Sequence, residues 1–179
     1  MKNIVYIATS LDGYIADKHG GIDWLDEFEN PEQEDMGFAK HMASIDALVM
    51  GKNTLDVVLS FGGDWTYSKP VFVLSNSMSR VPESLQDKVF IVSGDIKHIV
   101  NMLHKQGFKN LYIDGGQVIQ QFLQAELIDE MVITTIPTLL GDGARLFGSL
   151  SQFQRFTLVD STVYLNALVQ NRYRRKNLD

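Results

Sequence analysis

Apolar and polar residues follow two alternating patterns along this chain, and together they predict an α/β protein. Runs made up mostly of apolar residues are typical of strands buried on both faces. They occur over residues 4–8, 47–50, 71–74, 89–92, 109–113 and 131–136. Apolar residues at three- and four-residue spacing predict helices between these runs, over 31–42, 54–59, 96–106 and 118–127. Two further runs, 156–163 and 167–175, predict a C-terminal hairpin.

Local signals define the ends of two of these helices. Asn30 is a candidate N-cap with Pro31 at the first helical position, which predicts that a helix begins at residue 31. Asp95 is a candidate N-cap for the next well-marked helix, and Gly107 is its expected stop.

The order of the elements predicts how the strands are arranged. Strands joined through helices form right-handed crossovers, so the sheet is expected to be mainly parallel. The final hairpin adds antiparallel strands to it. There is no repeat or linker, so residues 1–179 are interpreted as one domain.

Composition excludes several classes of function. The net charge of −6 argues against a nucleic-acid-binding protein, which would present a basic face. The chain has no cysteine, so disulfides, thiolate catalysis and thiolate metal sites are excluded. The histidines His19, His41, His98 and His104 show no metal-ligand spacing and are expected at the surface, so no metal is predicted. No segment reads as a signal peptide or a membrane span, which favours a soluble, cytoplasmic protein.

The segment Asp114-Gly115-Gly116-Gln117-Val118 joins a predicted strand to a predicted helix. Glycines have no Cβ, so the backbone at this junction can approach a ligand closely. The following helix directs free N–H groups and the positive end of its dipole at the same point, which suits a phosphate or pyrophosphate. The alternative is a tight turn, or close packing of helix against strand.

Similar residues follow several other predicted strands. Gly, Ser, Thr and Asn recur at the segments Ser10–Gly13, Gly51–Thr54, Ser75–Asn76 and Ser93–Gly94. Ligands of open α/β sheets bind beyond the carboxyl ends of the strands, so these segments are expected to meet at one site. Lys52 adds a cation, as a dinucleotide with an extra ribose phosphate requires. Taken singly, Thr54 could be a helix N-cap and Ser75–Asn76 a plain turn.

Five motifs, in order along the chain, resemble those of the dihydrofolate reductase superfamily. Within that superfamily the chain is most similar to the reductase domain of bacterial riboflavin biosynthesis. The motifs are Ser10–Ala16, Val49–Thr54, Asp114–Val118, Leu127–Glu130 and Pro137–Gly143. The resemblance implies a three-layer α/β/α domain, a homodimer, and NADPH as cofactor.

The same resemblance assigns the cofactor-binding residues. Those implied to contact NADPH are Ala8, Ile15, Gly51, Lys52, Asn53, Thr54, Leu74, Ser75, Asn76, Gly115, Gly116, Gln117 and Val118. Among them, Ala8 and Ile15 would border the nicotinamide, and Lys52 would lie near the 2′-phosphate. The family usually has arginine at the position of Lys52. Lysine keeps the charge but loses the planar fork, which leaves the preference for NADPH over NADH open.

Three carboxylates are candidates for proton transfer or substrate orientation. Glu34 and Asp35 fall where dihydrofolate reductases carry a carboxylate on the first helix, and Asp12 belongs to the motif beside the nicotinamide. The alternatives are an acidic helix face for Glu34 and Asp35, and a turn-forming Asp-Gly pair for Asp12.

The implied reaction is the reduction of a ribosylamino-pyrimidine that carries a phosphate. Trp24 and Arg145 are the candidate substrate-binding residues, and Arg145 is favoured over Lys2 and Lys69 as the phosphate's cation. Asp23 stands where dihydrofolate reductases usually have proline, which counts against folate. The alternatives are a pterin or dihydrofolate reductase, and a module that binds NADPH without catalysis.

Overall fold

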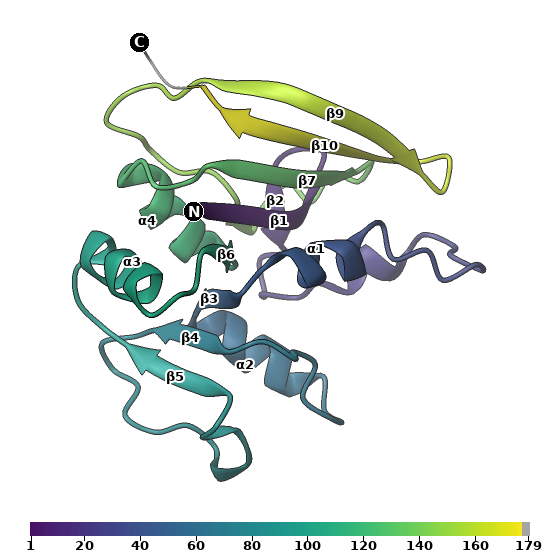
Figure 1. Cartoon of the computed structure of the whole chain (residues 1–179). Helices are drawn as coiled ribbons and strands as arrows, with labels where there is room; N and C mark the ends of the chain where they lie inside the picture. The colour runs from purple at the N-terminus through teal and green to yellow at the C-terminus, as the bar shows by residue number, and fades with distance from the viewer. Residues whose placement is uncertain (177–179) are drawn as a thin grey trace.

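The computed structural model describes residues 1–176, and an eight-stranded sheet runs through the middle of the molecule (Figure 1). The strand order across the sheet is β5-β4-β3-β6-β1-β7-β10-β9. All the predicted strands are present, and their bounds differ from the prediction by one or two residues at most. They are β1 (Lys2–Ser10), β3 (Ala47–Gly51), β4 (Val71–Leu74), β5 (Val89–Val92), β6 (Asn110–Ile113), β7 (Glu130–Ile136), β9 (Phe156–Tyr164) and β10 (Leu168–Arg175).

The directions of the strands confirm the predicted topology. Strands β5, β4, β3, β6, β1 and β7 pair in parallel. Strand β10 pairs antiparallel with β7, and β9 pairs antiparallel with β10, as the C-terminal hairpin requires. The carboxyl ends of the parallel strands therefore share one edge of the sheet, where ligands of open α/β sheets bind.

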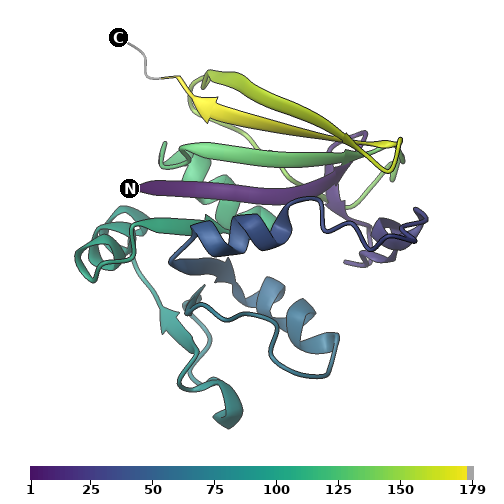
Figure 2. The same ribbon diagram turned by 45° about the vertical axis from the view of Figure 1, so that its right-hand side comes forward.

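Helices cover both faces of the sheet and make the three layers that the resemblance implied (Figure 2). Helices α3 (Ile96–Lys105) and α4 (Gly116–Gln124) pack with the sheet into one apolar core around Phe122. Helices α1 (Phe38–Ser44) and α2 (Lys52–Ser60) pack into a second core on the opposite face, around Leu55 and Leu48. No helix within residues 1–176 is long and apolar enough to cross a membrane.

The helix predicted over 31–42 is wrong in its first half. Gln33 and Met36 have left-handed backbones, with φ of 52° and 54°, and Gly37 has a φ of 85°. The carbonyl of Met36 accepts hydrogen bonds from the Tyr6 hydroxyl and the Gln170 amide, which hold this turn against the sheet. A continuous helix would remove these contacts, so α1 begins only at Phe38.

The structure also contains short elements that the sequence did not predict. Strands β2 (Tyr14–Ala16) and β8 (Ala144–Arg145) pair with each other outside the main sheet. Two 3-10 helices span Asp23–Asp26 and Glu83–Leu85. Elements of two to four residues are too short to show a periodicity, so the hydrophobic pattern of the sequence does not predict them.

His41 is buried, which corrects the expectation that the histidines lie at the surface. Its ring stacks on Tyr6 at 4.7 Å and meets the edge of Tyr112 at 4.7 Å. The Nε2 atom has no hydrogen-bond partner within the described chain. Burial, with a smaller contribution from the charge of Arg172, lowers the pKa of His41 from 6.5 to about 4. The imidazole is therefore neutral in the folded protein at neutral pH.

His41 is expected to make the fold sensitive to acid. The unfolded chain takes up a proton below pH 6.5, whereas the folded chain does so only near pH 4, so stability falls as pH drops between these values. The loss should reach about 2–3 kcal/mol, and His41→Phe should remove most of it. Urea unfolding of both proteins across this range measures the difference. The exposed His98, replaced in the same way, is the control for the loss of a histidine outside the core.

Strand β9 forms an edge of the sheet and presents apolar side chains to solvent. Leu158, Val159 and Val163 are 54%, 46% and 62% exposed. An unpaired edge of this kind is a template for association with another chain. The homodimer implied by the family resemblance stays a prediction.

Candidate active site

A cavity of about 900 Å³ opens at the shared edge of the parallel strands. The residues that follow β3, β4, β5 and β6 line it, together with Ala8 near the end of β1. Four of the five predicted strand-end segments therefore meet in one place. The exception is Ser10–Gly13, none of whose residues lines the cavity.

The first phosphate-binding candidate is the turn that begins α2. Gly51 is the N-cap of this helix, so Lys52, Asn53 and Thr54 form its first turn. Thr54 is the third helical residue, and its interpretation as an N-cap is wrong. The Lys52 ammonium lies 2.5 Å from the carboxylate of Asp56, one turn along the helix, and its side chain is 48% exposed. Lys52 is therefore free to turn toward a phosphate at the cavity mouth, because exposed pairs of this kind are weak.

The second candidate turn begins α4, and its two glycines lie against neighbouring segments. Gly115 is the N-cap of α4 with a φ of 86°, and a Cβ here would lie 2.2 Å from the Thr54 hydroxyl oxygen. A Cβ on Gly116 would lie 2.8 Å from Cδ1 of Ile15 and 3.2 Å from the carbonyl oxygen of Arg145. Because Gly115 and Gly116 have no side chains, the N-termini of α2 and α4 can lie close together at one cavity. The positive ends of both helix dipoles favour a negatively charged group there.

All thirteen residues predicted to contact the cofactor line this cavity. They come from β1 and β2, from the turns after β3 and β4, and from the start of α4: Ala8, Ile15, Gly51, Lys52, Asn53, Thr54, Leu74, Ser75, Asn76, Gly115, Gly116, Gln117 and Val118. Their shared position is a structural observation, and their contact with a dinucleotide stays a prediction.

Asp12 lies outside the cavity and braces a loop. Its carboxylate accepts hydrogen bonds from the Ser10 hydroxyl at 2.6 Å and from the backbone N–H groups of Leu140 and Gly141. The hydrogen bond from Ser10, followed by those of the backbone, lowers the pKa of Asp12 to about 2. Asp12 is therefore ionised and unable to donate a proton near neutral pH, and its contacts are those of the turn-forming alternative.

Glu34 and Asp35 also lie outside the cavity, in the turn that replaces the first half of the predicted helix. The Asp35 carboxylate accepts hydrogen bonds from the N–H groups of Gly37 and Ala39, which lower the pKa of Asp35. It acts as a cap for α1. Glu34 accepts a hydrogen bond from the N–H of Met36, and both carboxylates are exposed. Neither is brought near the turns of Gly51 and Gly115.

The two predicted substrate-binding residues have different positions. Trp24 is 6% exposed and packs with Ile136 and Leu168 in a small apolar core, so it does not line the cavity. Arg145 does line it, and donates a hydrogen bond of 2.7 Å to the Tyr14 hydroxyl. The guanidinium carbon also lies 4.6 Å from the centre of the Tyr14 ring, a cation–π contact that fixes its direction.

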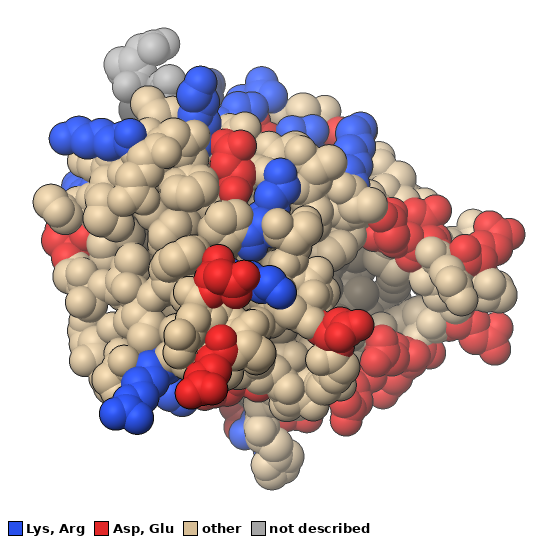
Figure 3. Space-filling model, turned by 60° about the horizontal axis from the view of Figure 1, so that its bottom comes forward, with Lys and Arg blue, Asp and Glu red and all other residues tan. Residues whose placement is uncertain are grey.

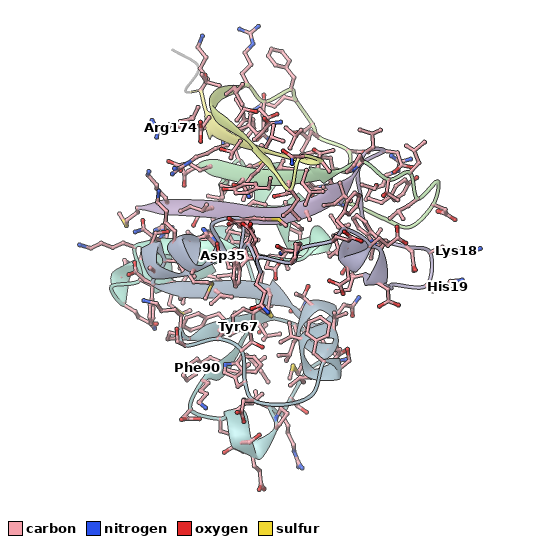
Figure 4. The ribbon with its side chains drawn as sticks, turned by 90° about the vertical axis from the view of Figure 1, so that its right-hand side faces the viewer. Lys18, His19, Asp35, Tyr67, Phe90 and Arg174 are labelled. Carbon is pink, nitrogen blue, oxygen red and sulfur yellow. The ribbon has the colours of Figure 1, made fainter. Side chains whose placement is uncertain are left out.

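Two cavity residues with shifted pKa values were not predicted. Burial raises the pKa of Asp114 from 3.8 to about 6, although the N–H of Gly115 donates a hydrogen bond to its carboxylate. Burial, and then the charge of Asp114, raises the pKa of Tyr67. Figure 4 shows Tyr67 near the middle of the molecule, on the segment between α2 and β4. Asp114 belongs to the predicted motif Asp114–Val118, but its burial results from tertiary packing and could not be predicted from the sequence.

Almost the whole chain is similar to a known protein family. Residues 2–169 match the model of the RibD C-terminal domain family. The chain belongs to this family. It is also 35% identical over 161 residues to YwjB, an uncharacterized protein of Bacillus subtilis, with 88% of each chain covered.

Several solved structures share the fold of this RibD C-terminal domain. A candidate riboflavin biosynthesis protein from Shewanella sp. PV-4 is 56% identical, with a TM-score of 0.97 over 99% of this chain and all of the other. At lower identity the fold alone is shared. The bifunctional deaminase and 5-amino-6-(5-phosphoribosylamino)uracil reductase of Thermotoga maritima has a TM-score of 0.76 at 16% identity, over 98% of this chain and 56% of that protein. Dihydrofolate reductase from Enterococcus faecalis, complexed with NADP(H), has a TM-score of 0.71 at 18% identity, over 98% of this chain and 97% of the other.

These comparisons confirm the family and the fold that the sequence motifs implied.

Proposed function

We propose that this protein is an NADPH-dependent reductase of a small heterocyclic substrate. The observation that carries the proposal is the cavity in which the N-termini of α2 and α4 meet around Gly51 and Gly115. Two helix N-termini on one cavity suit the two phosphates of a dinucleotide. Family membership and the reductases that share the fold support the same assignment.

The lining residues fit the parts of NADPH from one end to the other. Ser75 and Asn76 follow β4 and offer hydrogen-bond donors to the adenosine end, with Lys52 supplying charge for the 2′-phosphate. The backbone around Gly51 and Gly115 would hold the pyrophosphate. Ala8 and Ile15 would border the nicotinamide, leaving its C4 atom facing the remainder of the cavity.

When bound, NADPH supplies a hydride to an electrophilic C=N or C=O carbon, and the protein supplies orientation and a proton. Asp114 is the carboxyl group that lines the cavity and holds its proton nearest to neutral pH. We assign to it the protonation of the substrate heteroatom, directly or through a water molecule. Asp12, Glu34 and Asp35 lie outside the cavity and receive no such role here.

The family suggests the first substrate scaffold to test. The Thermotoga maritima protein acts, by its name, on 5-amino-6-(5-phosphoribosylamino)uracil. An aminopyrimidine with a ribosylamino side chain has the C=N or C=O carbon that hydride reduction needs. NADPH binding without oxidation by such pyrimidines or by pterins would favour the binding-module alternative.

Titration of the protein with NADPH and with NADH, followed by tryptophan fluorescence, tests the cofactor. NADPH should bind more tightly, and Lys52→Ala should raise the Kd for NADPH about tenfold while leaving that for NADH unchanged. Lys97→Ala removes an exposed lysine of α3 outside the cavity and is the control. If the folded protein binds neither nucleotide, the proposed function is wrong.

A further inference from the structure

Three tyrosines pack into the apolar core on the α1 and α2 face of the sheet, and two of them use their hydroxyl groups inside the protein. The Tyr6 hydroxyl donates to the carbonyl of Met36 at 2.8 Å, and the Tyr112 hydroxyl donates to the carbonyl of Tyr6 at 2.9 Å. The third is Tyr67, whose hydroxyl forms no hydrogen bond within residues 1–176. The protein itself therefore makes no use of this hydroxyl.

The Tyr67 hydroxyl is accessible to a ligand. The residue lines the cavity, and its oxygen is not among the buried polar atoms that lack a partner. The ring, in contrast, is held by packing, because it meets the Trp65 ring edge to face, with 5.4 Å between the ring centres. Phenylalanine would fill the same place in the core, and a buried tyrosine normally has a partner for its hydroxyl. A bound ligand can supply that partner.

Asp114 is the second polar group in this part of the cavity. Figure 3 shows exposed acidic side chains gathered on one side of the molecule, next to a hollow in the surface. Among the described residues that line the cavity, however, Asp114 provides the carboxyl group. It comes two residues after Tyr112, which packs in the same core as Tyr67. Burial, and then the charge of Asp114, raises the pKa of Tyr67, so the two side chains lie close enough to interact.

The two groups keep their protons over different pH ranges. Burial raises the pKa of Asp114 to about 6, so this carboxyl exchanges its proton near neutral pH. The raised pKa of Tyr67 keeps its hydroxyl protonated throughout that range. Tyr67 is therefore a constant hydrogen-bond donor beside a group that can transfer a proton.

We propose that Tyr67 is a substrate-binding residue whose hydroxyl donates a hydrogen bond to a ring carbonyl of the heterocycle. Its place beside Asp114 brings this carbonyl close to the heteroatom that Asp114 protonates, so the hydrogen bond orients the ring for reduction. A site of this kind rejects an analogue that lacks the carbonyl, because the hydroxyl is then left unpaired. The inference rests on the proposed function and restricts its substrate to heterocycles with a ring carbonyl, a class that includes the uracils.

Two neutral probes that differ in their ring carbonyls test this role without hydride transfer. The compound 6-aminouracil has two ring carbonyls, and 4-aminopyrimidine has none. Each is titrated by calorimetry into protein saturated with NADP⁺, which has no hydride to donate. Fluorescence titration establishes first that the dinucleotide binds, so failure of the proposed function is recognised separately.

The wild-type protein should bind 6-aminouracil more tightly than 4-aminopyrimidine. Tyr67→Phe should raise the Kd for 6-aminouracil about tenfold and leave that for 4-aminopyrimidine unchanged. The tenfold loss should stay constant across the pH range in which Asp114 titrates, because Tyr67 keeps its proton there. Tyr173→Phe removes a hydroxyl of β10 outside the cavity and is the matched control.

Three results would overturn the inference. Equal weakening of both probes by Tyr67→Phe would show that Tyr67 only shapes the cavity. Unchanged Kd values in this variant would show that the hydroxyl does not contact the ring. A wild-type protein that binds NADP⁺ but does not prefer 6-aminouracil would show that the site does not recognise a ring carbonyl.

Discussion

Replacement of Gly115 by alanine is expected to raise the Kd for NADPH at least about a hundredfold. Gly115 has a φ of 86°, and a Cβ would lie 2.2 Å from the Thr54 hydroxyl oxygen. Something must shift to relieve the clash, and because Thr54 is in the first turn of α2, we expect the N-termini of α2 and α4 to move apart at the proposed pyrophosphate site. The left-handed backbone adds about 1 kcal/mol of strain in any L-residue.

Gly107→Ala separates the clash from the strain. Gly107 also has a positive φ, 99°, but a Cβ there would meet nothing within 4 Å. Both variants should lose stability in urea unfolding, and only Gly115→Ala should lose cofactor affinity, measured by fluorescence titration. Equal affinities in the two variants would show that the close contact between α2 and α4 does not shape the cofactor site.

Asp114→Asn is expected to lower kcat by a factor of about 10² to 10³ while making the protein more stable at neutral pH. The folded-state pKa of about 6 lies above the unfolded value of 3.8, so the stability contributed by the protonated carboxyl is complete below pH 3.8 and is lost as pH rises through 6. Asparagine keeps a neutral side chain throughout, so the variant should gain about 2 kcal/mol above pH 6.

Rate and stability measured together across pH test this assignment. The wild-type rate should fall as pH rises above about 6, because the proton donor is then ionised. The stability curves of wild type and variant should converge near pH 4. Asp87→Asn, at an exposed position outside the cavity, is the control for the loss of one charge. An unchanged kcat in Asp114→Asn would leave the carboxyl without a catalytic role.

The glycine turns could be predicted because their signals are local. Gly51 and Gly115 each follow an apolar strand and begin a helix, so the sequence around each shows both the turn and what it joins. The parallel sheet follows from the alternation of elements in the same way. Thr54 and Gly115 lie close together because both turns are at the same edge of the sheet. Once the parallel sheet was predicted, the closeness of the two turns followed from it.

The helix predicted over 31–42 failed because distant residues decide its shape. Gln170, far along the chain, donates to the Met36 carbonyl and helps to fix a turn that local propensity cannot foresee. The carboxylates show the same limit. Asp12, Asp35 and Asp114 are the same residue type, and only tertiary burial distinguishes Asp114, whose pKa is raised toward neutral pH, from the two whose pKa is lowered.

The hydrogen bonds from the backbone N–H groups of Leu140 and Gly141 to Asp12 join two segments that are synthesised far apart in time. The wall of the cavity beside β2 is completed by Ala144 and Arg145 of β8, more than 120 residues after Asp12. A nascent chain that still lacks this segment has both glycine turns but leaves the cavity open beside β2. On the proposed function, NADPH would therefore stabilise only the nearly finished protein, and we expect that the cofactor would not rescue a chain truncated before residue 140.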